Sequence, residues 1–162
     1  MIEQGVLLML ITEKRSNLMI MPCTLVCCIS ADFTTCAGFS KQLRDIGVGE
    51  VLNLGEVLNR NSPKWEGVGY CLPVDIIRNE YFPFPQKVYN LVIKDKYWHK
   101  SSYDTMKQAL LSMKKLIIRD NIKTIAMPKI GCSLDRLRWA KVKTIIAEIF
   151  KDTDIKIIVC HL

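Results

Sequence analysis

The most informative part of the sequence is Met127-Pro128-Lys129-Ile130-Gly131-Cys132-Ser133-Leu134-Asp135-Arg136-Leu137-Arg138-Trp139. It follows an apolar run at 123–127 that is typical of a buried strand, and it leads into an amphipathic segment. Pro128 and Gly131 interrupt both patterns, so the sequence predicts a strand, a short loop and then a helix. A loop of this kind exposes backbone N–H groups at the positive end of a helix dipole, and it therefore suits an anion.

The same alternation of strand and helix extends through the second half of the chain. Short apolar runs predict strands at about 6–11, 24–29, 69–74, 88–93, 123–127 and 155–160. Amphipathic segments predict helices at about 102–119 and 135–151, and a weaker pattern predicts a third at 39–46. We therefore expect an α/β fold with a largely parallel or mixed sheet and helices on both of its faces.

The two stronger helices have apolar residues at helical spacing. In the first these are Met106, Leu110, Met113 and Ile117, and in the second Leu137, Ala140, Ile145, Ile149 and Phe150. The N-cap candidates of the first helix are Ser101, Ser102 and Asp104. The prolines and glycines of segment 60–87 predict one strand between irregular connections.

Composition restricts the class of protein. The chain has 162 residues, of which 49% are hydrophobic and 24% charged, so we expect a single domain over 1–162. The apolar run at 6–11 is too short for a membrane span, and the preceding Glu3 argues against a signal peptide. Seven cysteines without a CxxC pair, and only two histidines, indicate buried thiols in a reducing compartment. We expect a nuclear or cytoplasmic monomer without metal, cofactor or membrane contact.

The formal net charge of +7 suits a polyanionic partner. A nucleic acid, a pyrophosphate and a modified protein that carries a pyrophosphate all fit this charge. The chain has no recognisable RNP or helix-turn-helix motif, so nucleic acid is the least expected of the three.

Three predicted strands end near Ile29, Ile93 and Met127. In open α/β sheets, ligands bind in the loops beyond the carboxyl ends of the strands. The loop after Ile29 lies in the stretch Cys28–Ser40, which contains small residues and Gly38. Taken alone, this stretch is only a connection between a strand and a helix.

Lys94 comes directly after a predicted strand. A neutral lysine is a good nucleophile, and burial or cationic neighbours such as Lys96 and Lys100 favour the neutral form. The alternative is a solvated loop lysine, which the spacing alone favours.

Asp135 also has two interpretations. At the start of the predicted helix its carboxylate suits an N-cap that accepts backbone N–H bonds. The alternative is a carboxylate that faces a ligand at the mouth of the loop. The spacing alone favours the N-cap.

These stretches together resemble the macro domain family, and among macro domains the chain is most similar to the terminal ADP-ribose protein glycohydrolases. The resemblance is carried by Ile11-Thr12-Glu13-Lys14, Cys28-Ile29-Ser30, Leu91–Tyr103, the stretch 127–139 and Thr153-Asp154-Ile155-Lys156. It is poor over about 50–87. It implies a three-layer α/β/α domain with a mixed central sheet that binds ADP-ribose.

The resemblance also implies roles for individual residues. Lys94 matches a lysine that attacks the distal ribose, displaces a glutamate or aspartate carboxylate and forms a transient lysyl adduct. Asp135 matches an aspartate that assists release. The implied ligand-binding residues are Leu18, Ser30, Lys129, Ile130, Gly131, Cys132, Ser133, Leu134 and Leu162.

Three positions depart from the family pattern. Asn17 stands where the family has an aspartate that accepts a bond from the adenine amino group, and its amide oxygen accepts without a charge. Cys36 and Ser133 replace glycines. If those glycines need positive φ or close approach to the ligand, a side chain costs about 1–2 kcal/mol, or roughly tenfold in affinity.

Two functions are consistent with these residues. The first is hydrolysis of ADP-ribose from glutamate- or aspartate-modified proteins, with O-acyl-ADP-ribose as a further substrate. The second is a non-catalytic module that recognises ADP-ribosylated proteins, which the two substituted glycines favour.

Overall fold

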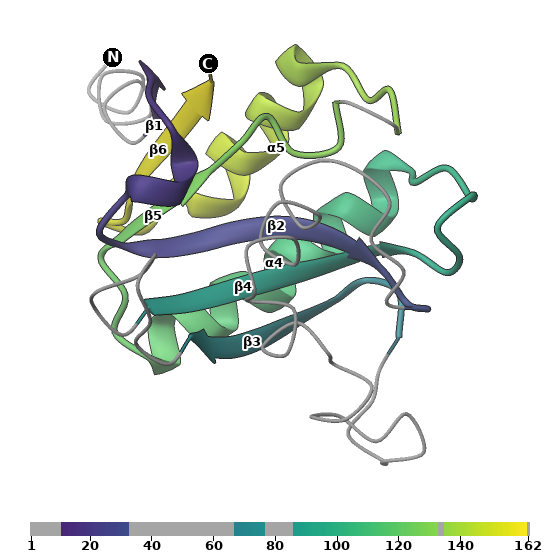
Figure 1. Cartoon of the computed structure of the whole chain (residues 1–162), viewed down its shortest axis with the longest axis horizontal. Helices are drawn as coiled ribbons and strands as arrows, with labels where there is room; N and C mark the ends of the chain where they lie inside the picture. Colours follow the sequence, from purple (N-terminus) through teal and green to yellow (C-terminus); the bar gives the residue numbers. More distant parts are fainter. Residues whose placement is uncertain (1–10, 33–66, 77–85, 133–134, 162) are drawn as a thin grey trace.

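The described residues form one mixed β-sheet with helices packed on it (Figure 1). The computed structural model describes residues 11–32, 67–76, 86–132 and 135–161. Within these ranges the strands are β1 (Ile11–Arg15), β2 (Thr24–Ser30), β3 (Tyr70–Ile76), β4 (Gln86–Lys94), β5 (Thr124–Met127) and β6 (Lys156–His161). The helices are η1 (Leu18–Ile20), α4 (Tyr103–Arg119) and α5 (Trp139–Phe150).

The sheet has the strand order β1-β6-β5-β2-β4-β3. All neighbouring strands are parallel except β3, which pairs antiparallel with β4. The prediction of a mixed sheet is thus confirmed. Pro73 lies in β3, where it is tolerated because β3 is an edge strand of this sheet and needs no ladder bond on its outer side.

Five of the six predicted strands are present at nearly their predicted positions. The sixth, predicted at 6–11, lies outside the described residues except for Ile11, as does the helix predicted at 39–46. The described N-terminal strand is β1, in which Ile11 is buried and the next four residues are exposed. An edge strand with this pattern lacks the apolar run from which the other strands were predicted.

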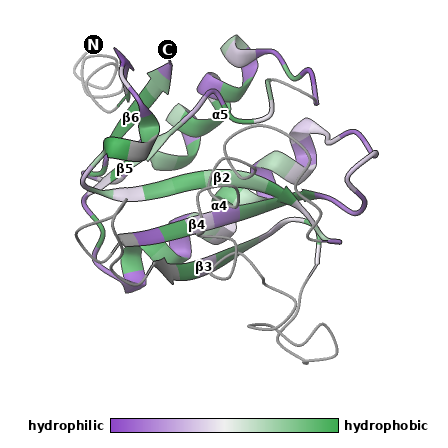
Figure 2. Ribbon diagram, viewed as in Figure 1, coloured by the Kyte–Doolittle hydropathy of each residue, from purple (hydrophilic) through white to green (hydrophobic). Residues whose placement is uncertain are grey.

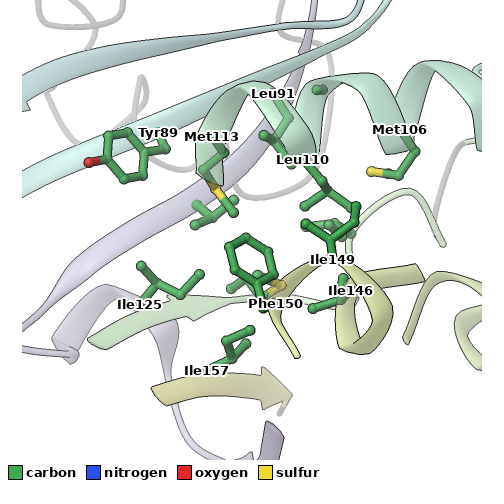
Figure 3. Packing of buried hydrophobic residues seen from close by; sticks show 14 of the residues in the cluster. Tyr89, Leu91, Met106, Leu110, Met113, Ile125, Ile146, Ile149, Phe150 and Ile157 are labelled. Atoms are coloured by element: carbon green, nitrogen blue, oxygen red, sulfur yellow. The ribbon is translucent and has the colours of Figure 1, made fainter. Parts of the chain in front are cut away.

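Each face of the sheet has its own hydrophobic cluster. α4 and α5 cover one face, where Phe150, Met113 and Leu110 meet side chains from the strands (Figure 3). On the other face Leu18 and Met21, at the ends of the η1 segment, pack against Leu25 and other strand residues. The hydropathy colouring of Figure 2 shows apolar residues along β2, as expected for a strand buried on both faces.

α4 begins where the sequence predicts. Ser102 is its N-cap, and a capping box with Thr105 satisfies two backbone N–H groups. The four predicted apolar residues are all buried. The helix ends at Arg119, and Asp120 is its C-cap.

α5 begins four residues later than predicted, at Trp139 rather than Asp135. Arg136 has a φ of +56°, which is incompatible with a right-handed helix, and Arg138 is extended. The buried face of α5 is formed by Val142, Ile146, Ile149 and Phe150. Of the residues predicted for this face, Ile149 and Phe150 are buried, whereas Ala140 is exposed and Ile145 is only partly buried.

Cysteines in the described ranges are free thiols. Cys27 is buried in the cluster on one face of the sheet, whereas Cys28 packs against the other, as expected for neighbours on a strand. Among the residues described, no helix has the length and apolar character needed to cross a membrane.

Candidate active site

The sheet topology brings three loops to the same edge. β5, β2 and β4 are neighbouring parallel strands, so their carboxyl ends lie side by side. Ser30 at the end of β2 is in register with Lys94 at the end of β4, and the Ala31 N–H donates to the Lys94 carbonyl at 2.8 Å. The third loop at this edge is the one that follows β5, which ends at Met127.

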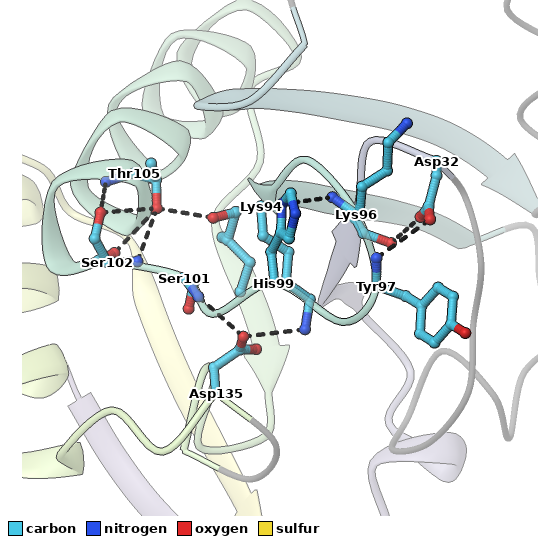
Figure 4. A network of polar contacts seen from close by, with 11 residues as sticks. Asp32, Lys94, Lys96, Tyr97, His99, Ser101, Ser102, Thr105 and Asp135 are labelled. Carbon is cyan, nitrogen blue, oxygen red and sulfur yellow. Dashed lines mark hydrogen bonds and ion pairs between the residues drawn. The ribbon is translucent and has the colours of Figure 1, made fainter.

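Lys94 and Asp135 meet at this edge. The Lys94 ammonium nitrogen lies 3.0 Å from Asp135 Oδ1, and the two side chains are only 11% and 10% exposed. The backbone N–H of Ser101 donates to the same oxygen at 3.1 Å (Figure 4). Lys94 is therefore not a solvated loop lysine.

Asp135 does not act as a helix cap. The N-cap of α5 is Arg138, whose side chain makes no capping bond. The N-cap interpretation is therefore wrong, and the carboxylate turns instead toward β4. The left-handed conformation of Arg136 separates Asp135 from the helix and leaves its carboxylate available to Lys94.

The loop before Asp135 is fixed from both sides. Gly131 has a φ of +73°, and a Cβ at this position would lie 2.7 Å from Met106 Cε and 2.9 Å from Leu137 Cδ1. The Leu137 N–H closes the loop by donating to the Gly131 carbonyl at 2.8 Å. Farther along, the Arg138 N–H donates to the Tyr103 hydroxyl at 3.0 Å, which ties the loop to α4.

The predicted ligand-binding residues of this loop have different environments. Ile130 is 2% exposed and belongs to the core, while Lys129 is exposed. The Cys132 N–H donates to the Lys129 carbonyl at 3.3 Å, and the Cys132 thiol donates to the Ile130 carbonyl at 3.3 Å. The predicted residues Ser133 and Leu134 lie outside the described ranges.

Cys28 lies beneath the loop. Burial raises the pKa of its thiol well above the usual range, with further contributions from Cys27 and Asp135, and the Gly131 N–H that points at the sulfur opposes the shift. The Gly131 N–H is therefore engaged by the protein itself. The N–H groups of Gly131 and Cys132 thus both have acceptors within the protein.

The other residues predicted to bind the ligand differ in burial, and some of them lie outside the described residues. Ser30 is 2% exposed, and its hydroxyl donates to the Asp32 carboxylate. Leu18 is 7% exposed and packs in the hydrophobic cluster on the face of the sheet opposite α4, while the neighbouring Asn17 is exposed. Leu162 and the substituted position Cys36 lie outside the described residues.

Sequence reasoning missed two residues at this edge. Asp32 accepts from the Tyr97 N–H at 3.2 Å and thereby joins the loop after β2 to the loop after β4. Ser101 holds Asp135 through its backbone N–H, and its buried hydroxyl has no hydrogen-bond partner among the described residues. An acidic residue two positions beyond a strand was a usable signal for Asp32, whereas a backbone donor such as Ser101 has no sequence signal.

The described residues contain no group of three or more His, Cys, Asp or Glu side chains arranged to hold a metal ion. At this edge the described residues bring one amine, that of Lys94, into contact with one carboxylate, that of Asp135. A buried amine and a carboxylate in contact can pass a proton between them and can attack an electrophilic carbon.

Comparison with known proteins identifies the class. Residues 73–146 match the family model described as the macro domain. The ADP-ribose glycohydrolase OARD1 of Bos taurus is 32% identical over 154 residues, which cover 94% of this chain and 91% of the relative. The chain therefore belongs to the macro domain family. The ADP-ribose glycohydrolase OARD1 of Homo sapiens is 40% identical over 75 residues, 46% of this chain and 49% of that protein.

Solved structures agree on the fold. The macrodomain of Mycobacterium tuberculosis DarG has a TM-score of 0.80 at 17% identity and covers 94% of this chain and 97% of that one. Thermosipho africanus DarTG, solved in complex with ADP-ribose, has a TM-score of 0.73 at 14% identity and covers 93% of this chain and 41% of that one. The expected three-layer α/β/α macro domain is thus confirmed.

Proposed function

We propose that this chain binds ADP-ribose and hydrolyses the ester that joins it to glutamate or aspartate side chains of modified proteins. The observation that carries the proposal is the 3.0 Å contact between Lys94 Nζ and Asp135 Oδ1. An amine and a carboxylate held together at the edge where ligands bind in α/β sheets form a nucleophile with its own base. The relatives named ADP-ribose glycohydrolase support the choice of substrate.

In the proposed reaction Asp135 accepts a proton from the Lys94 ammonium. The freed amine then attacks the anomeric carbon of the distal ribose, the carbon–oxygen bond breaks, and the acceptor carboxylate leaves. Asp135 gives that proton to the leaving carboxylate and, ionised again, accepts a proton from the water that attacks the anomeric carbon of the lysyl adduct. The carbon–nitrogen bond breaks, which releases ADP-ribose and restores Lys94. An O-acyl-ADP-ribose in which the small acid is joined to the same anomeric carbon would react by the same steps.

The Ser101 N–H keeps Asp135 in place during these steps. Because it donates to Oδ1, the oxygen that also faces Lys94, it orients the carboxylate without blocking Oδ2. A neutral backbone donor of this kind stabilises the carboxylate and fixes its direction. Ser101 is thus a positioning residue.

The test measures release of ADP-ribose from a glutamate-modified protein and, separately, binding of ADP-ribose by calorimetry. Wild type should do both, and Lys94→Ala should retain binding but lose release by roughly 100-fold or more. Lys123→Ala is the control, because Lys123 forms an ion pair with Asp154 but is 61% exposed. A Lys94→Ala protein that releases ADP-ribose as fast as wild type would exclude this mechanism.

The second candidate is a module that recognises ADP-ribose without turnover. It is favoured by the side chains of Cys36 and Ser133 at positions where the family has glycine. Calorimetric binding of ADP-ribose by wild type, with no release from either ester, would establish it in place of the hydrolase.

A further inference from the structure

A cluster of exposed aromatic side chains begins three residues after Lys94. Trp98 is 65% exposed and Tyr97 45% exposed. The rings of Tyr97 and Trp98 are 5.1 Å apart at 86°, and those of Trp98 and His99 are 5.4 Å apart at 75°. We call 96–100 the aromatic segment. Adjacent large exposed rings beside a reactive pair are typical of a contact surface rather than of scattered surface residues.

The aromatic segment is held firmly although its side chains are exposed. The Tyr97 N–H donates to Asp32, and the His99 N–H donates to the Lys96 carbonyl at 3.0 Å. Figure 4 shows the bond from Tyr97 to Asp32, a further bond from the Lys96 N–H to His99 Nδ1, and the bond from Ser101 to Asp135, which fixes the end of the loop. A surface whose backbone is already ordered loses little conformational entropy when a partner binds.

The position of the segment relates it to the acceptor protein. In the proposed reaction the acceptor carboxylate leaves from the carbon that Lys94 attacks. The polypeptide that carries this carboxylate must therefore pass close to Lys94. If it is extended, each residue that flanks the modified one adds roughly 3.3–3.6 Å to the distance from the site. The residues that follow Lys94 on the outside of the site are those of the aromatic segment.

Charge complements this placement. Lys96 and Lys100 lie on the segment, which follows Asp95 in the sequence and is bonded to Asp32 through the Tyr97 N–H. The loop after β5 adds further exposed cations, which are Lys129, Arg136 and Arg138. A polypeptide modified on glutamate or aspartate carries the opposite charge whenever further acidic residues flank the modified one.

The aromatic and basic residues would also suit single-stranded nucleic acid, which stacks on aromatic rings in a positive groove. Here the cations do not form a continuous track, because Asp95 and Asp104 lie among them. The acidic polypeptide is the occupant that the charges favour.

We propose that Tyr97, Trp98 and the flanking lysines form the surface that contacts the acceptor polypeptide of an ADP-ribosylated protein, an acidic segment with an apolar side chain near the modified residue. The inference rests on the proposed function, because it needs ADP-ribose at the Lys94 edge. It goes beyond that function in assigning protein recognition to residues that take no part in the chemistry.

The experiment compares two ligands that share ADP-ribose and differ in the acceptor. One is an acidic protein that carries a single glutamate-linked ADP-ribose, and the other is the ADP-ribose ester of acetic acid. Release from both is measured for wild type, Trp98→Ala and Ile118→Ala. Ile118 is the matched control, because it is 64% exposed but lies at the end of α4 far from Tyr103.

Trp98→Ala should lose roughly tenfold in kcat/KM on the modified protein through KM, a loss typical of an interfacial tryptophan. It should hydrolyse the acetyl ester as wild type does, and Ile118→Ala should match wild type on both. A Trp98→Ala protein that equals wild type on the modified protein, or that loses equally on both substrates, overturns the proposal.

Binding separates this inference from the proposed function. In a Lys94→Ala background, Trp98→Ala should weaken binding of the modified protein roughly tenfold and leave binding of free ADP-ribose unchanged. That result supports the surface even if wild type proves to lack turnover. If neither ligand binds, both proposals fail. If Trp98→Ala instead weakens binding of a single-stranded oligonucleotide and not of the modified protein, the segment is a nucleic-acid surface.

Discussion

Lys94 Nζ and Asp135 Oδ1 are 3.0 Å apart, although 41 residues separate them in the chain. Their contact depends on the order of strands in the sheet. β2 lies between β4 and β5, so the ends of these three strands are close together. It also depends on Arg136, whose left-handed backbone turns Asp135 away from α5. The reactive pair is thus a product of strand order and of one loop conformation.

The Lys94–Asp135 contact should be measurable as a coupling energy. Both side chains are nearly buried, so removal of one leaves the other charge without its partner, at a cost of about 1–3 kcal/mol. A double-mutant cycle with Lys94→Met and Asp135→Asn, followed by urea unfolding, should give a coupling of about 1–2 kcal/mol. The exposed Lys123–Asp154 pair should give less than about 0.5 kcal/mol. Equal couplings for the two pairs would mean that the first is solvated as well.

Much of this arrangement could be predicted from local patterns. The apolar runs predict the central strands, and the spacing of apolar residues with Ser102 predicts α4 and its start. The start of α5 could not be predicted, because the left-handed φ of Arg136 results from packing of the loop and not from the residue's preference. The four residues by which β1 extends beyond the predicted strand at 6–11 could not be predicted, because exposed residues of an edge strand have no hydrophobic period.

The site itself was predictable only in part. That Lys94 and Asp135 follow separate strands is visible in the sequence, but their distance is not, since it depends on which strands are neighbours. The burial of Ile130 could not be predicted either, because a single apolar residue in a loop is not part of a periodic pattern that indicates burial. Asp32 and the Ser101 N–H act through bonds between loops that are distant in sequence.

Gly131→Ala should destabilise the loop that holds Asp135. A side chain in the left-handed region costs about 1–2 kcal/mol, and the new Cβ would also lie 2.9 Å from Leu137 Cδ1. We expect a total loss of about 2–3 kcal/mol in the free energy of unfolding, measured in urea. Gly67→Ala is the control, because Gly67 has a similar φ of +76° and no atom within 4 Å of its Cβ position. If the two variants lose the same free energy of unfolding, the close contacts of the new Cβ at position 131 cost no stability.

Asp120 should make stability depend on pH in the acid range. Arg119 lowers the pKa of this carboxyl well below its ordinary value, and Tyr89 and Lys87 add to the effect against the opposing cost of burial. Because the folded-state pKa lies below the unfolded one, the stabilisation is complete above pH of about 4 and is lost as the pH falls. Asp120→Asn should therefore cost about 1–2 kcal/mol at pH 7 and flatten the loss of stability between about pH 4 and pH 2.

Asp152→Asn is the control for this pH dependence. Lys114 also lowers the pKa of Asp152, but the carboxyl is 68% exposed and solvent screens the pair. Its removal should change the acid slope much less than removal of Asp120. Unfolding curves of wild type and Asp120→Asn that stay parallel from pH 5 to pH 2 would show that the Asp120 cluster does not stabilise the folded state.

The thiol of Cys23 should react with alkylating reagents over an unusual pH range. Burial raises its pKa from 9.0 to about 11, and Cys160 adds to this shift. Only the thiolate is nucleophilic, so the labelling rate should increase about tenfold per pH unit and continue to increase between pH 9.5 and pH 10.5. Glutathione, with an ordinary thiol, should level off over the same interval.

Iodoacetamide labelling followed by fragment mass spectrometry distinguishes Cys23 from its neighbours. Cys27 and Cys71 are 1% and 0% exposed, so they should stay unlabelled until the protein is denatured, and they report on whether the fold survives at the higher pH. A Cys23 rate that levels off near pH 9 while Cys27 and Cys71 remain protected would mean that the thiol is as solvated as a free cysteine, although it packs against the hydrophobic cluster on its face of the sheet.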